Sequence, residues 1–156
     1  NMAHEVEADS AQYEHGALKY QAGTPNVAGP VGLAAALDVL DRIGLDAVRQ
    51  HDDALVAHAR ARFARVPGLR VLGSLETTGR LPVFTFALRG VATARLVAAL
   101  DAEGIAVRGG DMAALPLLRR FGLTDAVRAS CYLYTTLDEI DRLADVLVRE
   151  AARASR

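Results

Sequence analysis

The stretch GIAVRGGDMAALPLLRRFG, residues 104–122, carries residue types at a spacing that could hold a small ligand. Arg108 ends an apolar segment, and the glycines Gly109 and Gly110 that follow permit a tight turn. Asp111 then opens a segment that is predicted to be a short helix. A loop between a strand and a helix often carries binding residues on a rigid scaffold. A plain strand-to-helix connection would have the same pattern, and spacing alone does not separate the two.

A second candidate is AVRASCYLY, residues 126–134, whose alternating character predicts a strand. The alternation places Arg128 and Ser130 with two tyrosines on one face, and Cys131 with apolar residues on the other. A guanidinium inside such a strand is costly unless it is paired, and its planar fork suits a carboxylate. Arg128 is therefore either half of a structural ion pair or a carboxylate ligand. Cys131 is expected to be a small core residue rather than a nucleophile.

A third candidate is the turn QAGTPN, residues 21–26, which precedes a predicted helix. Gly23, Thr24 and the free N–H groups of the helix start could bind an anion such as a phosphate, or could form an ordinary helix cap. His51 and His58 are seven residues apart, about 10 Å along a helix axis. That distance is too long for one metal ion without other ligands. We interpret them as part of a solvated helix face and expect no metal site.

The elements that must position these residues follow from hydrophobic periodicity and turn residues. Two helices are predicted first, at 29–44 and 46–65, and the remaining chain alternates strands with helices. The strands are predicted at 70–73, 81–88, 105–108 and 126–134, and the later helices at 93–104, 113–122 and 136–154. Thr136 and Glu139 have the spacing of a capping box. The fold class is α/β (α+β): a small mixed β-sheet packed with helices and preceded by two long helices.

Composition narrows the function classes. A net charge of −1 over 156 residues argues against a nucleic-acid surface. No apolar run approaches the roughly 18 residues of a membrane span, and no signal peptide is visible at the start of the sequence. A single cysteine excludes an internal disulfide and fits a reducing compartment. A cytoplasmic location is expected.

Three segments, taken together, have a pattern typical of one protein family. YQAGTPNVAGPVGLAAALDVLDRIG, then GIAVRGG with ALPLLRRFG, then VRASCYLYTTLDEIDRL follow one another between residues 20 and 147. In this order they resemble the C-terminal part of cysteine desulfurases and selenocysteine lyases. These enzymes are class V aminotransferases of fold type I and use pyridoxal 5'-phosphate (PLP).

The resemblance implies roles for individual residues. Thr24, beside Gly23, matches the threonine that reaches the PLP phosphate of the other subunit in a dimer. Arg128 matches the arginine that binds the substrate's α-carboxylate, and Arg108 matches an arginine lining the active-site loop. The family's persulfide-forming cysteine falls on Ala113, so this loop lacks its nucleophile.

The resemblance also implies what lies outside the chain. The family's Schiff-base lysine belongs to an S-x-H-K motif, whereas Lys19 is the only lysine here and lies in ALKY. We therefore expect Asn1 to be an internal residue and the large PLP-binding domain to be absent from the chain. The expected division is a lead-in arm with the phosphate-contact turn (1–28), a helical linker (29–66) and a small C-terminal domain (67–156).

The resulting functional expectation is the C-terminal portion of a PLP enzyme that acts on an amino acid. It would pair with a large PLP domain of the same or a split protein and form a homodimer. Without the loop cysteine it is expected not to form a persulfide, and the isolated chain is expected to be inactive. The alternative is a non-catalytic interaction module or a relic domain.

Overall fold

The computed structural model describes residues 2–74, 76 and 79–155 of the chain. They belong to two compact units, Asn1–Leu45 and Asp46–Arg156. Within the described residues, no helix combines the length and the apolar character needed to cross a membrane.

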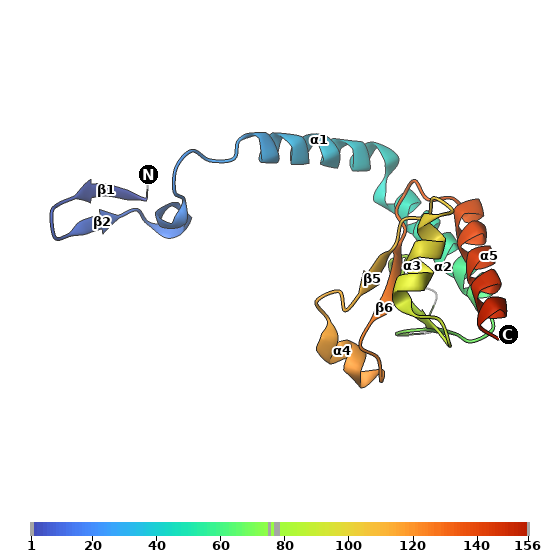
Figure 1. The fold of residues 1–156 in the computed structure, drawn as a ribbon. Helices are drawn as coiled ribbons and strands as arrows, with labels where there is room; N and C mark the ends of the chain where they lie inside the picture. Colours follow the sequence, from blue (N-terminus) through green and yellow to red (C-terminus); the bar gives the residue numbers. More distant parts are fainter. Residues whose placement is uncertain (1, 75, 77–78, 156) are drawn as a thin grey trace. The chain divides into compact units, whose positions relative to one another are not determined.

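The first unit consists of a hairpin, a short 3-10 helix and one long helix (Figure 1). Strands β1 (Ala3–Val6) and β2 (Ala11–Tyr13) pair antiparallel, and helix α1 (Ala28–Ile43) ends at Gly44 as predicted. The hairpin was missed by the prediction of an arm without regular structure. Its strands are almost wholly exposed on both faces, so they carry no hydrophobic alternation that could identify them.

The second unit contains a four-stranded sheet in the order β3-β4-β6-β5. The strands are β3 (Leu69–Val71), β4 (Val83–Leu88), β5 (Arg108–Gly110) and β6 (Ala126–Ser130). The α/β class is confirmed, but the prediction of a mixed sheet is wrong, because each described neighbouring pair is antiparallel. The helix between β4 and β5 connects two strands that run in the same direction. These strands are not neighbours, because β6 lies between them and runs antiparallel to both.

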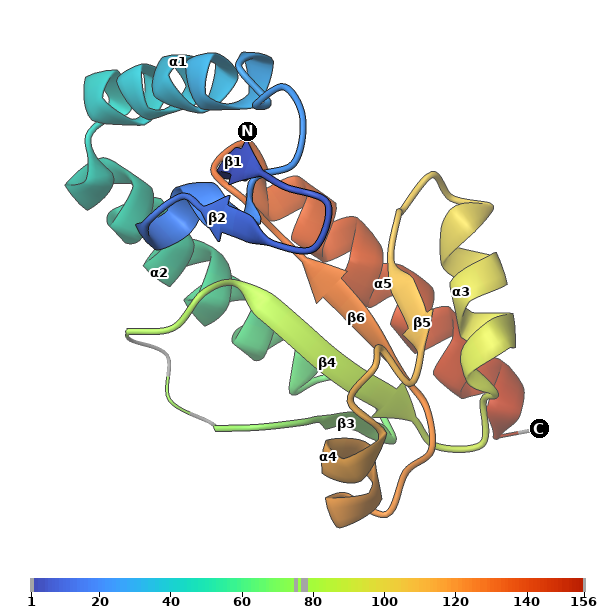
Figure 2. The same ribbon diagram turned by 90° about the vertical axis from the view of Figure 1, so that its left-hand side faces the viewer.

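One face of the sheet is covered by α2 (Leu45–Phe63), α3 (Thr93–Asp101) and α5 (Leu137–Ala154), as Figure 2 shows. Phe84 and Phe86 from β4 and Val127 from β6 pack there against all three helices, and none of these side chains is more than 1% exposed. Helix α2 thus belongs to this core. The expected linker of residues 29–66 placed it instead together with the first helix.

The opposite face of the sheet carries only the short helix α4 (Leu115–Arg120) at one end (Figure 2). A small cluster lies beneath it, formed by Leu72, Leu118 and Ala126. Among the described residues of the second unit, no other helix lies over this face.

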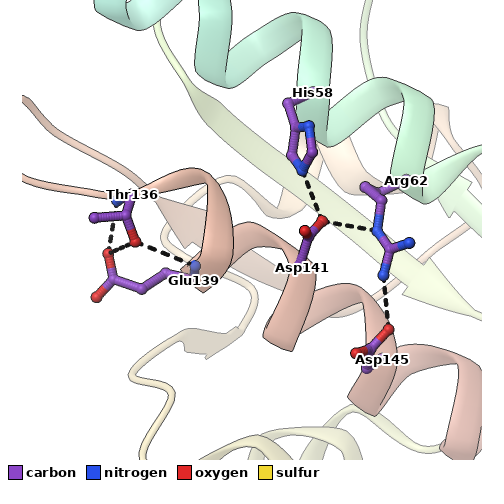
Figure 3. Close-up of polar contacts among 6 residues, drawn as sticks. All are labelled: His58, Arg62, Thr136, Glu139, Asp141 and Asp145. Carbon is purple, nitrogen blue, oxygen red and sulfur yellow. Dashed lines mark hydrogen bonds and ion pairs between the residues drawn. The ribbon is translucent and has the colours of Figure 1, made fainter.

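The predicted solvated face of the second helix is wrong for both histidines, which are half-buried against the end of the chain. His58 Nε2 lies 2.6 Å from Asp141 Oδ1 of α5, and Arg62 bridges Asp141 and Asp145 (Figure 3). His51 Nε2 lies 2.9 Å from the Thr135 carbonyl oxygen. Polar residues spaced along a helix can face solvent or another helix equally well, so the spacing did not distinguish these cases.

Helix α5 begins with the predicted capping box, which Figure 3 shows. The Thr136 N–H donates to Glu139 Oε2 at 2.7 Å, and the Glu139 N–H donates to Thr136 Oγ1 at 3.3 Å. The Thr136 hydroxyl also donates to Glu139 Oε2, at 3.1 Å. The bond from the Thr136 N–H, followed by the one from its hydroxyl, lowers the pKa of the Glu139 carboxyl below its usual 4.5. The cap fixes the start of the helix directly after the turn that follows β6.

Candidate ligand site on the open face of the sheet

Strand register brings the two predicted arginines together. Arg128 on β6 lies directly opposite Arg108 on β5 and, on its other side, opposite Thr85 on β4. Directly opposed residues of antiparallel strands project from the same face. The three side chains therefore form a row across the open face, and two of them carry the same charge. Like charges in direct opposition destabilise a sheet, so this row favours an anionic ligand.

Arg128 has no internal partner among the residues that the structure describes. Its side chain is half-buried, and its Nε is buried without a hydrogen-bond acceptor. No carboxylate of the described part lies within ion-pair distance of Arg128, so the structural ion pair that the sequence left open is not formed there. A buried guanidinium nitrogen without an acceptor carries a desolvation cost. A bound carboxylate would remove that cost.

A cavity of about 320 Å³ lies where Arg128 meets α4. Its walls come from the two residues after β3, from β4 and β6, from the loop after β5, and from α4 and its end. The lining residues are Leu72, Gly73, Thr85, Met112, Ala114, Leu117, Leu118, Phe121 and Arg128. Arg128 is the only charged residue among these nine. The cavity therefore combines one cation with largely apolar walls.

The loop between β5 and α4 has a strained backbone. Met112 and Ala113 both have left-handed conformations, with φ of 52° and 56°, a region that side chains other than glycine seldom occupy. The Ala113 N–H donates to Asp111 Oδ1 at 3.1 Å, and the Ala114 N–H donates to the Asp111 carbonyl at 2.8 Å. Asp111 thus holds the turn in place.

One glycine before this loop is required by packing. A Cβ on Gly109 would lie 2.6 Å from Val97 Cγ2 of α3. Only glycine lets β5 approach α3 so closely, which fixes Arg108 next to Arg128. Gly109 of the opening motif therefore serves the position of Arg108.

Cys131 lies just beyond β6 and packs against the main core, as the alternation predicted. Burial, followed by the charges of Glu139 and Asp52, raises the pKa of its thiol to about 11. A protonated, half-buried thiol is a poor nucleophile. This agrees with the expected role of Cys131 as a core residue.

The Gly23–Thr24 turn belongs to the first unit. Gly23 has a φ of +74°, and Thr24 is exposed. Asn26 supplies the cap of the following helix, because its Oδ1 accepts from the Gly29 N–H at 3.0 Å. The cap is thus provided by the neighbouring asparagine, and the roles of Gly23 and Thr24 as cofactor contacts remain predictions.

Sequence reasoning missed several residues of the site. Thr85 could have been found, because it is the one polar residue between two phenylalanines in a strand of strict alternation. Met112 and the α4 residues Leu117 and Phe121 carried no such signal, since their place depends on how the loop folds back over the sheet.

The comparisons with known proteins agree with this architecture. The Aminotransferase class-V family matches residues 1–143, and the chain therefore belongs to the class V aminotransferase family. A cysteine desulfurase of Synechococcus elongatus is 38% identical over 149 residues, which are 96% of this chain and 24% of that protein. The chain thus spans about a quarter of the length of this relative.

Solved structures of cysteine desulfurases are also similar to this chain. A cysteine desulfurase from Escherichia coli is 33% identical with a TM-score of 0.83, covering 97% of this chain and 37% of that one. A cysteine desulfurase from Thermococcus onnurineus NA1 is 27% identical with a TM-score of 0.87, covering 97% and 38%. The chain corresponds to a fragment of these enzymes.

Proposed function

We propose that this chain is the C-terminal part of a PLP-dependent enzyme that acts on an amino acid, with Arg128 binding the substrate's α-carboxylate. The observation that carries the proposal is the Arg128 guanidinium, which has no acceptor for its buried Nε among the described residues and lines a cavity beside the loop. Arg108, directly opposite, adds a second positive charge that attracts the carboxylate.

The chain's own residues fit part of a PLP site. The Thr24 hydroxyl and the backbone of Gly23 precede a helix that has no acidic residue in its first turn, which suits a phosphate. When bound, PLP draws electrons from the substrate's α-carbon. We expect the lysine that would carry PLP to lie outside this chain, since Lys19 is its only lysine and lies in ALKY, not in an S-x-H-K motif. That lysine would come from a large domain of the same or a split protein, in a homodimer.

The missing loop thiol sets the reaction class. With alanine at position 113 and the Cys131 thiol held protonated, the chain offers no thiolate that could accept sulfur. The proposed enzyme is therefore a lyase or transferase, with a selenocysteine lyase-like reaction included, rather than a persulfide-forming desulfurase. We place it in the cytoplasm, on the ground of its single cysteine.

A non-catalytic role as an interaction module is the second candidate. Helix α1 has no buried residue and exposes apolar side chains such as Val31, Leu33 and Leu37. Such a helix is suited to packing against another domain or protein. Under the first proposal, the same surface would pack against the PLP-binding domain.

The experiment begins with the gene product that contains this chain, loaded with PLP, and measures exchange of the α-proton of amino acids in deuterated water. The whole protein should catalyse exchange, and this chain alone should not. Arg128→Ala should lower the specificity constant about ten- to a hundredfold, the effect of losing a charged hydrogen bond. Arg120→Gln removes an exposed arginine outside the cavity and should leave exchange unchanged.

Two further results would separate the candidates. Ala113→Cys should not create rapid sulfide release from cysteine, because Asp111 beside it opposes thiolate formation. If the whole protein binds no PLP and exchanges no α-proton, the interaction module is the better account.

A further inference from the structure

We propose that the cavity between the open sheet face and α4 binds an apolar side chain of the substrate, so that the substrate is an apolar amino acid. This inference rests on the proposed function, because it takes Arg128 as the carboxylate ligand. It adds what that function leaves open, the chemical class of the side chain.

The composition of the cavity carries the inference. Leu72, Met112, Ala114, Leu117, Leu118 and Phe121 form most of the wall. The lining contains only two polar side chains, Arg128 and Thr85, and these lie directly opposite each other on the sheet. A ligand with one acidic end and an apolar body would satisfy both parts of the wall. A polar side chain would lose its hydration there with few partners to replace it.

The positions of the lining residues indicate how such a ligand would lie in the cavity. Arg128 and Thr85 are on the sheet, whereas Leu117 and Phe121 belong to α4 and its end, so the cation and the apolar wall come from different elements. A carboxylate on Arg128 can therefore direct its chain between the sheet and α4. Loop residue Met112 contributes to the wall and also packs on the small cluster under α4. Its flexible thioether can adapt to chains of different length.

The cavity can be probed in the 156-residue chain itself, without cofactor. Acetate, butanoate and hexanoate are suitable probes, because they keep the acidic end and lack the amino group that the cofactor would engage. The chain has two methionines, Met112 in the cavity and Met2 in the other unit. When the methionine methyl groups are labelled with ¹³C, NMR would show two signals. The Met112 signal is the reporter, and the Met2 signal is an internal control.

We expect hexanoate to shift the Met112 methyl signal in a saturable way and to leave Met2 unchanged. Affinity should rise about fourfold for each methylene from acetate to hexanoate, as expected for burial of hydrocarbon. Hexanol, which lacks the acid, should bind at least about tenfold more weakly than hexanoate.

Two variants and a control test the assignment. Arg128→Gln should weaken hexanoate binding at least about tenfold, whereas Arg120→Gln, an exposed charge outside the cavity, should have no effect. Leu117→Asn changes a wall residue that is 55% exposed, so folding should persist. In this variant, the affinity should depend less on the number of methylenes in the probe.

The proposal is overturned if affinity does not depend on chain length, or if Arg128→Gln and Arg120→Gln behave alike. It is also overturned if Leu117→Asn leaves the chain-length dependence intact. The results on hydrocarbon length would leave the proposed function standing, because that function is read from α-proton exchange in the whole protein. Equal effects of the two arginine variants would in addition remove Arg128 as its carboxylate ligand. Conversely, hexanoate binding without any exchange would leave a carboxylate site but remove the enzymatic role.

Discussion

The two faces of the four-stranded sheet use alternate residues of the same strands for different purposes. On the covered face, Phe84, Phe86 and Val127 lie under three helices and are at most 1% exposed. On the open face, Thr85 and Arg128 project from the same strands toward a cavity. The covered face anchors the strands, so the open face can carry two opposed arginines on which the core does not depend. Binding residues gain fixed positions in this way without having to stabilise the fold.

The largest expected contrast between the faces is in stability. Phe86→Ala should lower the free energy of unfolding by about 3–5 kcal/mol, because it opens a cavity in the core. Arg128→Ala should change it by no more than about 1 kcal/mol, since it removes some packing but also the repulsion from Arg108. Urea denaturation followed by circular dichroism measures both.

A large loss of stability in Arg128→Ala would contradict this division. It would mean that the arginine holds the sheet together and is not reserved for a ligand. Phe84→Leu, a milder change on the covered face, serves as a control that the assay resolves intermediate losses.

The second contrast concerns reactivity at the edge of the covered face. Because burial raises the pKa of the Cys131 thiol to about 11, its thiolate fraction at pH 8 is about a hundredfold below that of an unperturbed thiol. Alkylation by iodoacetamide should be slower than that of a free cysteine peptide by a similar factor. The rate should keep rising with pH up to about 11. Reaction in urea, where burial is lost, is the control, and a rate equal to that of the peptide under native conditions would refute the burial.

The contrast between the faces was partly visible in the sequence. Alternation in AVRAS assigned Arg128 and its apolar neighbours to different faces, because burial on one side leaves a period of two. The continuation of the last strand to Tyr134 was wrong, since β6 ends at Ser130 and a turn follows. β-Branched and aromatic residues favour strands but do not fix where pairing ends.

The candidate site was predicted less completely than the fold. Arg108 and Arg128 were identified singly, but their direct opposition depends on register between strands far apart in sequence. The strand predicted at 105–108 is in fact β5 at Arg108–Gly110, so the glycines belong to the strand and not only to the turn. Local periodicity carries no information about such non-local pairing.

A third, smaller effect is expected at the start of α5, a helix of the covered face. Thr136→Ala removes the capping side chain and should cost about 1 kcal/mol of stability. The pKa of Glu139 is lowered in the folded state. Its contribution is therefore present above the ordinary pKa of 4.5 and is lost as pH falls through the lowered value.

The pH dependence checks the mechanism of the cap. In the parent chain, stability should fall below pH 4.5, and Thr136→Ala and Glu139→Gln should each reduce that acid-dependent loss. Asp138→Asn, on the neighbouring residue, is the matched control. An unchanged profile in Glu139→Gln would show that another carboxylate is responsible.

The smallest effect is expected in the loop of the open face. Ala113 has a φ of 56°, and a left-handed conformation costs a residue with a Cβ roughly 1–2 kcal/mol. Ala113→Gly removes that cost but increases the conformational entropy of the unfolded chain, which offsets roughly 0.4–1 kcal/mol. The net result should be a stabilisation of about 0.5 kcal/mol. Ala98→Gly, an exposed position inside α3, is the control, because a helical residue gains nothing from glycine. It should destabilise the protein, so the two substitutions should have opposite signs in the same denaturation assay. If both destabilise equally, the loop does not hold the left-handed turn that places Met112 in the cavity wall, and the open face loses one side of its site.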